Sequence, residues 1–319
     1  MKRFSLLVLI ILLVLSGCQK PASDPGTFTV YSLQGPTSMG IVKLYEDSAA
    51  ETSFNRYQPV IVSDASEVAA ALTTGKTDIA MLPANVAATL YNKNGGFKVV
   101  AINTLGVLYL LENGITIQSV SDLAGKTVCL TGQGTTPEYA LRYLLNYYSI
   151  EDQVTLEFKS TANEVAAYLA SELSGIGLLP QPFATSAMMQ NADLRIALDL
   201  TEEWRKTTDE SILITGVTLV RDEVLAEHPD QVAEFLKEYE ASVNWVNEHP
   251  KEASELIEKY GIVAKAAVAQ KALPVCSLCF ISNSKMKDML SGYLNTLLKA
   301  NPKTVGGKLP DDAFYYTHE

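Results

Sequence analysis

Short apolar segments of β type alternate with segments of helical periodicity along most of this chain, and that alternation constrains the fold most strongly. The segments expected to be strands are residues 27–33, 57–62, 77–82, 98–103, 127–130, 154–159, 175–179 and 195–198. Helices are expected between them at residues 38–50, 66–73, 138–148, 163–173 and 184–190, and another helix is expected to follow residues 83–85. Strands that alternate with helices form mainly parallel sheets covered by helices on both faces. The sequence therefore predicts an α/β fold.

The last third of the chain has a different pattern. A long β-type run at residues 211–221 is able to pass back to the first part of the fold, and mostly helical segments follow it. These are residues 222–226, 230–248, 251–260, 263–271 and 285–300. With 319 residues, 47% of them apolar, the chain can build two lobes with a core each. The net charge of −11, without a basic block, argues against nucleic acid as a partner.

The first residues have the composition of a leader. Lys2 and Arg3 precede an unbroken apolar run at residues 6–15, and the letters LSGC follow at residues 15–18. The run is too short for the ~20 apolar residues that a bilayer span needs. This order is typical of a secretory signal peptide. An ordinary secreted cysteine behind a generic signal is the alternative interpretation.

A leader that ends on cysteine resembles the signals of bacterial lipoproteins. The resemblance implies that residues 1–18 are a lipoprotein signal peptide ending at Cys18. The Cys18 thiol would carry palmitate-type acyl chains, and Cys18 would become the first residue of the mature protein. Residues 19–26 are polar with two prolines, and we expect a flexible tether there. The expected location is extracytoplasmic, lipid-anchored to the cell membrane.

The remaining cysteines and the histidines give little support for catalysis. Cys129 is an odd cysteine, whereas Cys276 and Cys279 are able to form a buried thiol pair, a local disulfide, a redox pair or half a metal site. We expect a thiol pair or a local disulfide, because few further metal ligands exist. The histidines are His228, His249 and His318.

A search of the sequence for known catalytic motifs likewise gives little support for catalysis. Residues 132–134 read GQG but lack the third glycine of a dinucleotide fingerprint, and no P-loop lysine follows. The chain has no Gly-x-Ser-x-Gly sequence. We therefore expect no enzyme, no cofactor and no metal site.

Four short motifs occur in the order and spacing of a known family. They are residues 75–80 (GKTDIA), 121–128 (SDLAGKTV), 132–137 (GQGTTP) and 180–185 (PQPFAT). Together they resemble the nitrate-, sulfonate- and taurine-type substrate-binding proteins of ABC importers, over essentially the whole chain after the leader. Proteins resembling yeast thiamine-pyrimidine synthase share that superfamily.

The resemblance implies the type II periplasmic-binding-protein fold. Two α/β lobes, each a mainly parallel sheet flanked by helices, would enclose a ligand cleft between them. Residues 27–110 and 215–319 would form the first lobe, and residues 111–214 the second. Sulfonate- and taurine-type members often carry an acidic or aromatic residue where this chain has Gln181 before Pro182. The substrate of those members therefore does not carry over.

The candidate site follows from the expected strands, because ligands of open α/β sheets bind beyond the carboxyl ends of strands. Asn85 and Gln181 are favoured for side-chain contacts, since an amide both donates and accepts. Helices that begin near Ser38 and Thr135 would direct free N–H groups at an anion or a carbonyl. The candidate ligand-binding residues are Gln34, Thr37, Ser38, Asn85, Gly134, Thr135, Thr136, Gln181 and Thr215.

The same residues have a structural interpretation. Gly132 and Gly134 would permit a tight turn, and the serines and threonines would cap helices. The selected turns contain no Arg or Lys, so a ligand held by a salt bridge is less favoured. Small anions and neutral heterocycles both remain open.

These observations lead to one hypothesis and two alternatives. The chain is expected to be the monomeric solute-binding lipoprotein of an ABC importer. It would capture a small organic or anionic solute, close by hinge motion near Gly106 and Gly216, and deliver the solute to a permease and its ATPase. One alternative is an enzyme resembling thiamine-pyrimidine synthase, which would need a cysteine-rich motif and an active-site histidine. The other is a ligand sensor for a membrane receptor.

Overall fold

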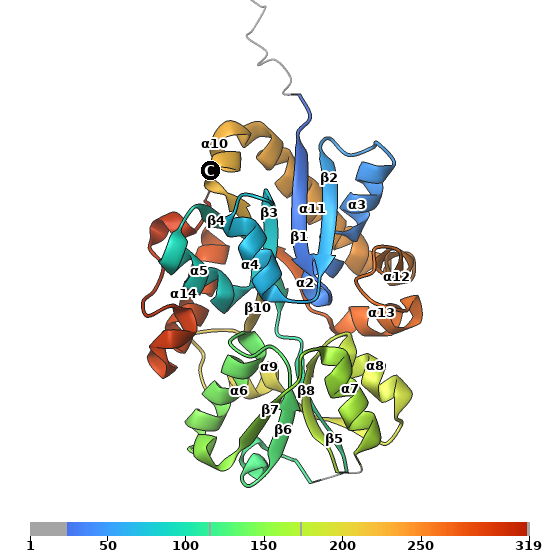
Figure 1. The fold of residues 1–319 in the computed structure, drawn as a ribbon, viewed down its shortest axis with the longest axis vertical. Coiled ribbons are helices and arrows are strands. Elements are labelled where there is room, and N and C mark those ends of the chain that lie inside the picture. Colours follow the sequence, from blue (N-terminus) through green and yellow to red (C-terminus); the bar gives the residue numbers. More distant parts are fainter. Residues whose placement is uncertain (1–23, 115, 173, 318–319) are drawn as a thin grey trace, which may run out of the picture.

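The computed structural model describes residues 24–114, 116–172 and 174–317, and they form two lobes, one above the other in Figure 1. The expected signal peptide, the lipidation at Cys18 and most of the tether lie outside these residues. Within the described ranges, no helix combines the length and the apolar character needed to cross a membrane.

Lobe 1 is built on a six-stranded sheet in the order β11-β4-β10-β3-β1-β2. Strands β1 and β2 are parallel, as are β1 and β3, whereas β10 is antiparallel to both of its neighbours and β11 is antiparallel to β4. The strands are β1 (Thr27–Leu33), β2 (Arg56–Val62), β3 (Ile79–Pro83), β4 (Phe97–Leu105), β10 (Ile214–Arg221) and β11 (Leu278–Ile281).

Helices cover both faces of this sheet (Figure 1). The longest, α11 (Pro229–Glu248), starts with a proline, which needs no N–H at that position. Its buried residues recur every three or four positions, so one face of the helix packs on the sheet. The other helices are α2 (Pro36–Met39), α3 (Val42–Ala49), α4 (Ala65–Thr73), α5 (Ala84–Asn94), α10 (Asp222–Glu227), α12 (Pro250–Lys259), α13 (Ala266–Ala272) and α14 (Asn283–Ala300).

Lobe 2 is built on a five-stranded sheet in the order β7-β6-β8-β5-β9. Strand β6 is parallel to β7 and β8, and β5 is antiparallel to β8 and β9. The strands are β5 (Leu108–Asn113), β6 (Thr127–Leu130), β7 (Thr155–Phe158), β8 (Ile176–Pro180) and β9 (Leu194–Asp199). The helices are α6 (Thr136–Tyr147), α7 (Ala162–Ser171), α8 (Phe183–Gln190) and α9 (Leu200–Arg205).

The expected α/β fold is confirmed, with mixed sheets. The chain passes from lobe 1 to lobe 2 between β4 and β5, and back between α9 and β10. Because β5 and β10 come directly from the other lobe without a helical crossover, each runs opposite to the parallel strands beside it. The lobe boundaries at residues 110 and 214 remain a proposal.

The structure adds elements that the sequence did not predict, and one expected helix is shorter. The short helix α9 and the strands β5 and β11 were not predicted. The helix expected at residues 38–50 is broken into α2 and α3 around Gly40. A Cβ atom at Gly40 would lie 3.0 Å from Cγ2 of Val243, so α11 packs closely against the break.

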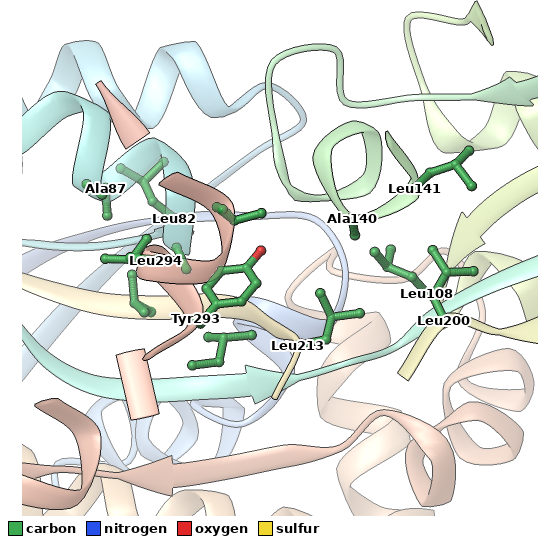
Figure 2. Close-up of a cluster of buried hydrophobic side chains, with 14 of the residues drawn as sticks. Leu82, Ala87, Leu108, Ala140, Leu141, Leu200, Leu213, Tyr293 and Leu294 are labelled. Carbon is green, nitrogen blue, oxygen red and sulfur yellow. The ribbon is translucent and has the colours of Figure 1, made fainter. Parts of the chain in front are cut away.

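One apolar cluster extends across both lobes (Figure 2). Tyr293 and Leu294 of α14 and Leu82 of β3 contribute from lobe 1. Ala140 and Leu141 of α6 contribute from lobe 2. The shared core holds the lobes together on the side where α14 meets α6.

Candidate ligand cleft between the lobes

A cleft of about 530 Å³ lies between the lobes, where parallel strands of both sheets end. Strands β1, β2 and β3 reach it from lobe 1, and β6, β7 and β8 reach it from lobe 2. The polar residues that line it are Gln34, Ser63, Asp64, Thr131, Gln133, Thr135, Lys159, Ser160, Thr161 and Asn163. The position agrees with the rule that ligands bind beyond the carboxyl ends of strands.

The lobe 1 wall is formed by turns that its own hydrogen bonds hold in place. The Asp64 carboxylate accepts a 2.7 Å hydrogen bond from the Ser66 N–H and so caps α4. The Gln34 side chain lines the cleft, and its Nε2 donates to the Gly261 carbonyl at 3.4 Å. Amide, hydroxyl and carboxylate groups are thus all available on this wall.

The lobe 2 wall carries the positive charge of the cleft. Lys159 follows β7, and its Nζ lies 2.6 Å from a Glu157 carboxylate oxygen and 5.7 Å from the centre of the Tyr168 ring. The hydrogen bond to Glu157 is the main cause that raises the pKa of Lys159, so this side chain stays protonated. Next to it, the Thr161 hydroxyl accepts from the Glu164 N–H at 3.2 Å and caps α7.

The turn before α6 needs a glycine at its first position. Gly132 has φ of 77°, and a Cβ atom there would lie 2.5 Å from Oγ1 of Thr135. That Oγ1 donates to the Gly132 carbonyl at 2.7 Å. Thr135 lines the cleft, so both the structural and the ligand-binding interpretations apply to it.

Asn85 links the two lobes beside the cleft. Its Nδ2 donates to the Gly134 carbonyl at 3.1 Å, and its Oδ1 accepts from the Thr136 hydroxyl at 3.2 Å. The same Nδ2 also lies 3.4 Å from the Thr304 carbonyl, within lobe 1. Asn85 is 1% exposed. The structure thus brings together three of the expected site residues, with their polar groups directed at one another.

The other expected residues are buried in structural contacts. The Gln181 side chain accepts from the Thr185 N–H at 3.2 Å and from its hydroxyl at 2.8 Å, and the Gln181–Pro182 peptide is cis. The Ser38 hydroxyl donates to the Leu33 carbonyl. The Thr215 hydroxyl donates to the Gly106 carbonyl, at a connection between the lobes.

Thr37 differs from these residues. It is 6% exposed, and its hydroxyl oxygen has no hydrogen-bond partner among the described residues. Its Cγ2 lies close to Gly216, where an added Cβ atom would be only 2.5 Å away. Thr37 therefore packs against Gly216 and is not among the residues that line the cleft.

Two groups of cleft residues were missed by the sequence analysis. They are Ser63 with Asp64, after β2, and residues 158–163, after β7. The strand-end rule applies equally to both strands, and the sequence predicts both of them. Extending the rule to them would have found Lys159, which supplies a cation that the selected turns lacked.

The described cysteines are free thiols, so the local disulfide expected as one possibility at Cys276 and Cys279 is not formed. Burial raises the pKa of Cys129 to about 11 and the pKa values of Cys276 and Cys279 to about 12. The Cys276 Sγ lies 4.0 Å from Sδ of Met39, inside an apolar cluster. No group of three or more metal-ligating side chains occurs among the residues that the structure describes.

Comparison with protein families gives one match over most of the chain. Residues 31–297 match the family described as menaquinone biosynthesis. No curated protein matches the sequence.

Solved structures with this fold include binding proteins. An ABC transporter structure from Parabacteroides distasonis has 26% identity and a TM-score of 0.76, with 92% of this chain and 99% of that chain covered. The periplasmic aliphatic sulphonate binding protein of Escherichia coli has 13% identity and a TM-score of 0.70, with 93% and 94% covered. A Candida albicans protein described as having the generic periplasmic binding protein fold has 14% identity and a TM-score of 0.60, with 90% and 92% covered. The periplasmic-binding-protein fold expected from the motifs is thereby confirmed.

Proposed function

The chain belongs to the menaquinone biosynthesis family, and from that premise and its fold we propose that it is the solute-binding protein of an ABC importer. It captures a small organic or anionic solute between its lobes and delivers it to a permease and its ATPase. The capturing unit is a monomer. The similar structure from Parabacteroides distasonis, described as an ABC transporter, supports this proposal.

The cleft is the observation that carries the proposal. It is open to solvent between two sheets, and both sheets contribute strand ends to it. Its lining supplies hydroxyl and amide groups, one carboxylate and one ammonium group. Such a small number of convergent polar groups in a concave site is typical of small-molecule recognition.

The leader gives the proposed place of action. Cys18 would hold the protein on the outer surface of the cell membrane, with residues 19–26 as the tether. Restricting the protein to the membrane raises its effective concentration near a permease, so weak docking is sufficient. Intact mass measurement of membrane-extracted protein tests this part, because lipidation adds a diacylglyceryl mass at Cys18 and Cys18→Ala abolishes it.

The decisive experiment is ligand identification. Native mass spectrometry of protein purified from its source gives the mass of a bound solute, and thermal shift and small-angle scattering then test the pure compound. The expected result is a higher Tm together with a smaller radius of gyration. If no candidate solute stabilises or compacts the protein, the importer function is wrong.

A matched pair of variants places the solute in the cleft. Lys159→Gln removes the cleft ammonium, and we expect at least a tenfold rise in Kd for an anionic solute. Lys206→Gln is the control, because Lys206 is likewise paired with a glutamate, at 2.7 Å from Glu203, and does not line the cleft. Equal Kd values for the two variants would contradict binding of an anion beside Lys159.

A second candidate function is an enzyme, and the family's description favours it. Asp64 and Lys159 place a carboxyl group and an ammonium group among the residues that line the cleft. The thiamine-pyrimidine type of enzyme has less support, because Cys276 is buried in an apolar cluster and no described histidine lines the cleft. Incubation of the protein with the solute, followed by mass spectrometry, distinguishes turnover from binding. A ligand sensor would instead co-purify with a membrane receptor rather than a permease.

A further inference from the structure

A second hollow opens beside the cleft, and nothing so far gives it a role. It has a volume of about 380 Å³ and lies between α8 of lobe 2 and the segment from Gly261 to Val268 of lobe 1. We call it the side groove. Its apolar lining residues are Pro182, Phe183, Met189, Ile262, Val263 and Val268.

The side groove lies next to the cleft. Gln34, Asn163 and Phe183 line both of them. The hydrogen bond from Gln34 Nε2 to the Gly261 carbonyl lies at this junction and joins the end of β1 to the segment after α12. A molecule seated in the cleft is therefore adjacent to the side groove, and these three residues border both sites.

The two hollows differ in chemistry. The cleft has hydroxyl and amide groups with Lys159 and Asp64. The side groove is mainly apolar, and Ser186, Gln190 and Lys265 are further polar residues that line it. Met189 is 47% exposed there, one of the few large apolar side chains exposed in the described part of the chain. An unbranched methionine adapts to ligands of different shape, so Met189 suits a groove that receives an apolar group.

We propose that the side groove holds the apolar arm of the solute whose polar head lies in the cleft. The solute class is thus a small amphipathic molecule with an alkyl or aryl arm. This inference rests on the proposed function. Because each lobe supplies one wall of the side groove, an arm bound there contacts both lobes and helps to keep them closed.

Paired probes test the inference directly. The acid probes are acetate, hexanoate and phenylacetate, and the neutral probes are methyl and hexyl β-D-glucoside. Thermal shift and calorimetry on the whole mature chain give the affinities. Within a pair, the probe with the longer arm is expected to bind more tightly, by about fourfold for each methylene group that becomes buried.

A matched pair of variants locates the arm. Met189→Asp introduces a charge into the side groove. We expect it to lower the ratio of long-probe to short-probe affinity at least tenfold. Ile196→Asp is the control, because Ile196 is also an exposed apolar residue of lobe 2, at 38%, and lines neither hollow. Met189→Leu is expected to keep the gain.

The outcomes separate this inference from the proposed function. If long and short probes bind equally, or if Met189→Asp behaves as Ile196→Asp does, the arm does not occupy the side groove and the inference is wrong, while solute capture in the cleft stands. If no probe and no co-purified molecule binds at all, the proposed function fails and the inference fails with it.

Discussion

The side-chain amide of Asn85 in lobe 1 donates a 3.1 Å hydrogen bond to the carbonyl of Gly134 in lobe 2. The Thr136 hydroxyl returns a bond of 3.2 Å to the same side chain. These bonds lie at the N-termini of α5 and α6, on the side where the apolar cluster of Figure 2 joins the lobes. Asn85 therefore fixes how closely the two lobes approach.

Removing this amide should loosen the lobes. Asn85→Ala deletes the bonds to Gly134 and Thr136, and we expect a loss of about 1–3 kcal/mol in the free energy of unfolding. We also expect a larger radius of gyration without ligand, measured by small-angle scattering. Urea denaturation gives the stability.

The control for this prediction lies two turns further along the same helix. The Asn92 amide donates to the carbonyls of Val305 and Lys308, at 2.7 Å each, and both belong to lobe 1. Asn92→Ala should destabilise the protein without expanding it. An unchanged radius of gyration in Asn85→Ala would show that the amide does not hold the lobes together.

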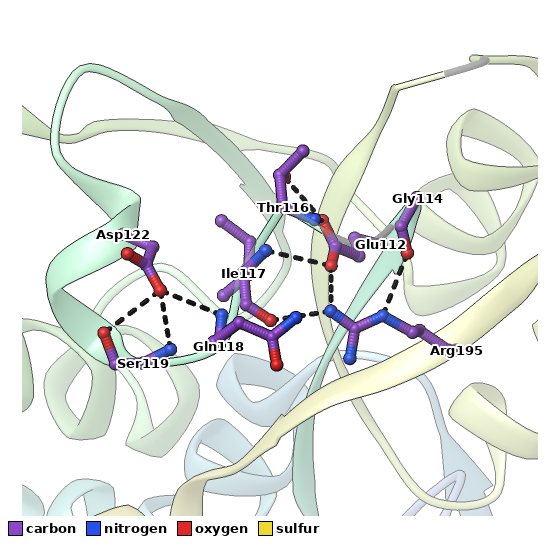
Figure 3. A network of polar contacts seen from close by, with 8 residues as sticks. All are labelled: Glu112, Gly114, Thr116, Ile117, Gln118, Ser119, Asp122 and Arg195. Atoms are coloured by element: carbon purple, nitrogen blue, oxygen red, sulfur yellow. Dashed lines mark hydrogen bonds and ion pairs between the residues drawn. The ribbon is translucent and has the colours of Figure 1, made fainter.

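Glu112 is the centre of a buried polar network at the far end of lobe 2 (Figure 3). Its carboxylate accepts from the Thr116 hydroxyl at 2.7 Å and from the Ile117 N–H at 3.0 Å, and it pairs with Arg195. Arg195 in turn donates to the Gly114 carbonyl at 2.9 Å. The ion pair thus joins β9 to β5, and the bonds of Thr116, Ile117 and Gly114 hold the segment after β5 against this pair.

Glu112→Gln should be destabilising. It leaves the Arg195 guanidinium without its carboxylate, but the Arg195 side chain is 32% exposed and stays partly hydrated. We therefore expect a loss of about 1–3 kcal/mol in the free energy of unfolding, the cost of weakening a charged hydrogen-bond network. Chemical denaturation at pH 7 measures this loss. A change below about 0.5 kcal/mol would mean that the pair is not formed in solution.

The same residue predicts a dependence on pH. Burial raises the pKa of Glu112, but the hydrogen bonds from Ile117 and Thr116 and the charge of Arg195 outweigh it, so the pKa is lowered. A lowered pKa stabilises the fold above the unfolded value of about 4.3 and loses this effect as the pH falls through the folded value. The stability difference between wild type and Glu112→Gln should therefore be constant near neutral pH and shrink below about pH 4.

Local sequence was sufficient for much of the fold. β1 and β6 have the bounds expected from their apolar runs, because strong turn residues end both runs. The short edge strand β11 was not predicted, because its pairing with β4 depends on a partner far away in sequence. The break after α2 likewise depends on the close contact of Gly40 with Val243 of α11.

For the site, sequence reasoning found the edge of the sheet but not the direction of each side chain. Gln34 and Thr135 do line the cleft, whereas the Asn85 amide forms hydrogen bonds with Gly134 and Thr136 of the other lobe. The Gln181 side chain points to the helix that follows it, α8, where it accepts a hydrogen bond from the Thr185 hydroxyl. Such orientations depend on tertiary packing, which no strand-end rule contains.

The thiols predict slow chemical modification of the folded protein. Burial raises the pKa of Cys129 to about 11 and that of Cys276 to about 12, so the reactive thiolate is scarce at pH 8. Alkylation by iodoacetamide, followed by mass spectrometry, should be at least about a hundredfold slower than in urea-unfolded protein, where the thiols have their ordinary pKa of about 8.5. Fast labelling of Cys276 in the folded protein at pH 8 would show that the apolar cluster around it opens to solvent.

Gly216 on β10 leads to the last prediction, because its missing side chain leaves room for two neighbours. An added Cβ atom would lie 2.3 Å from Oδ1 of Asn103 and 2.5 Å from Cγ2 of Thr37. Asn103 cannot move aside easily, since its Nδ2 donates to the Thr218 hydroxyl at 3.0 Å and its Oδ1 accepts from the Thr104 hydroxyl at 2.9 Å.

Gly216→Ala should therefore lower the free energy of unfolding by about 1–3 kcal/mol, the usual cost of overpacking a buried site. Because Thr37 lies in α2, directly after the turn that carries Gln34, we also expect a several-fold weaker affinity for the solute. Denaturation and calorimetry on the same preparation measure both effects. A variant with unchanged stability would show that the side chains of Thr37 and Asn103 can move aside. The contact with Gly216 would then not fix the position of α2.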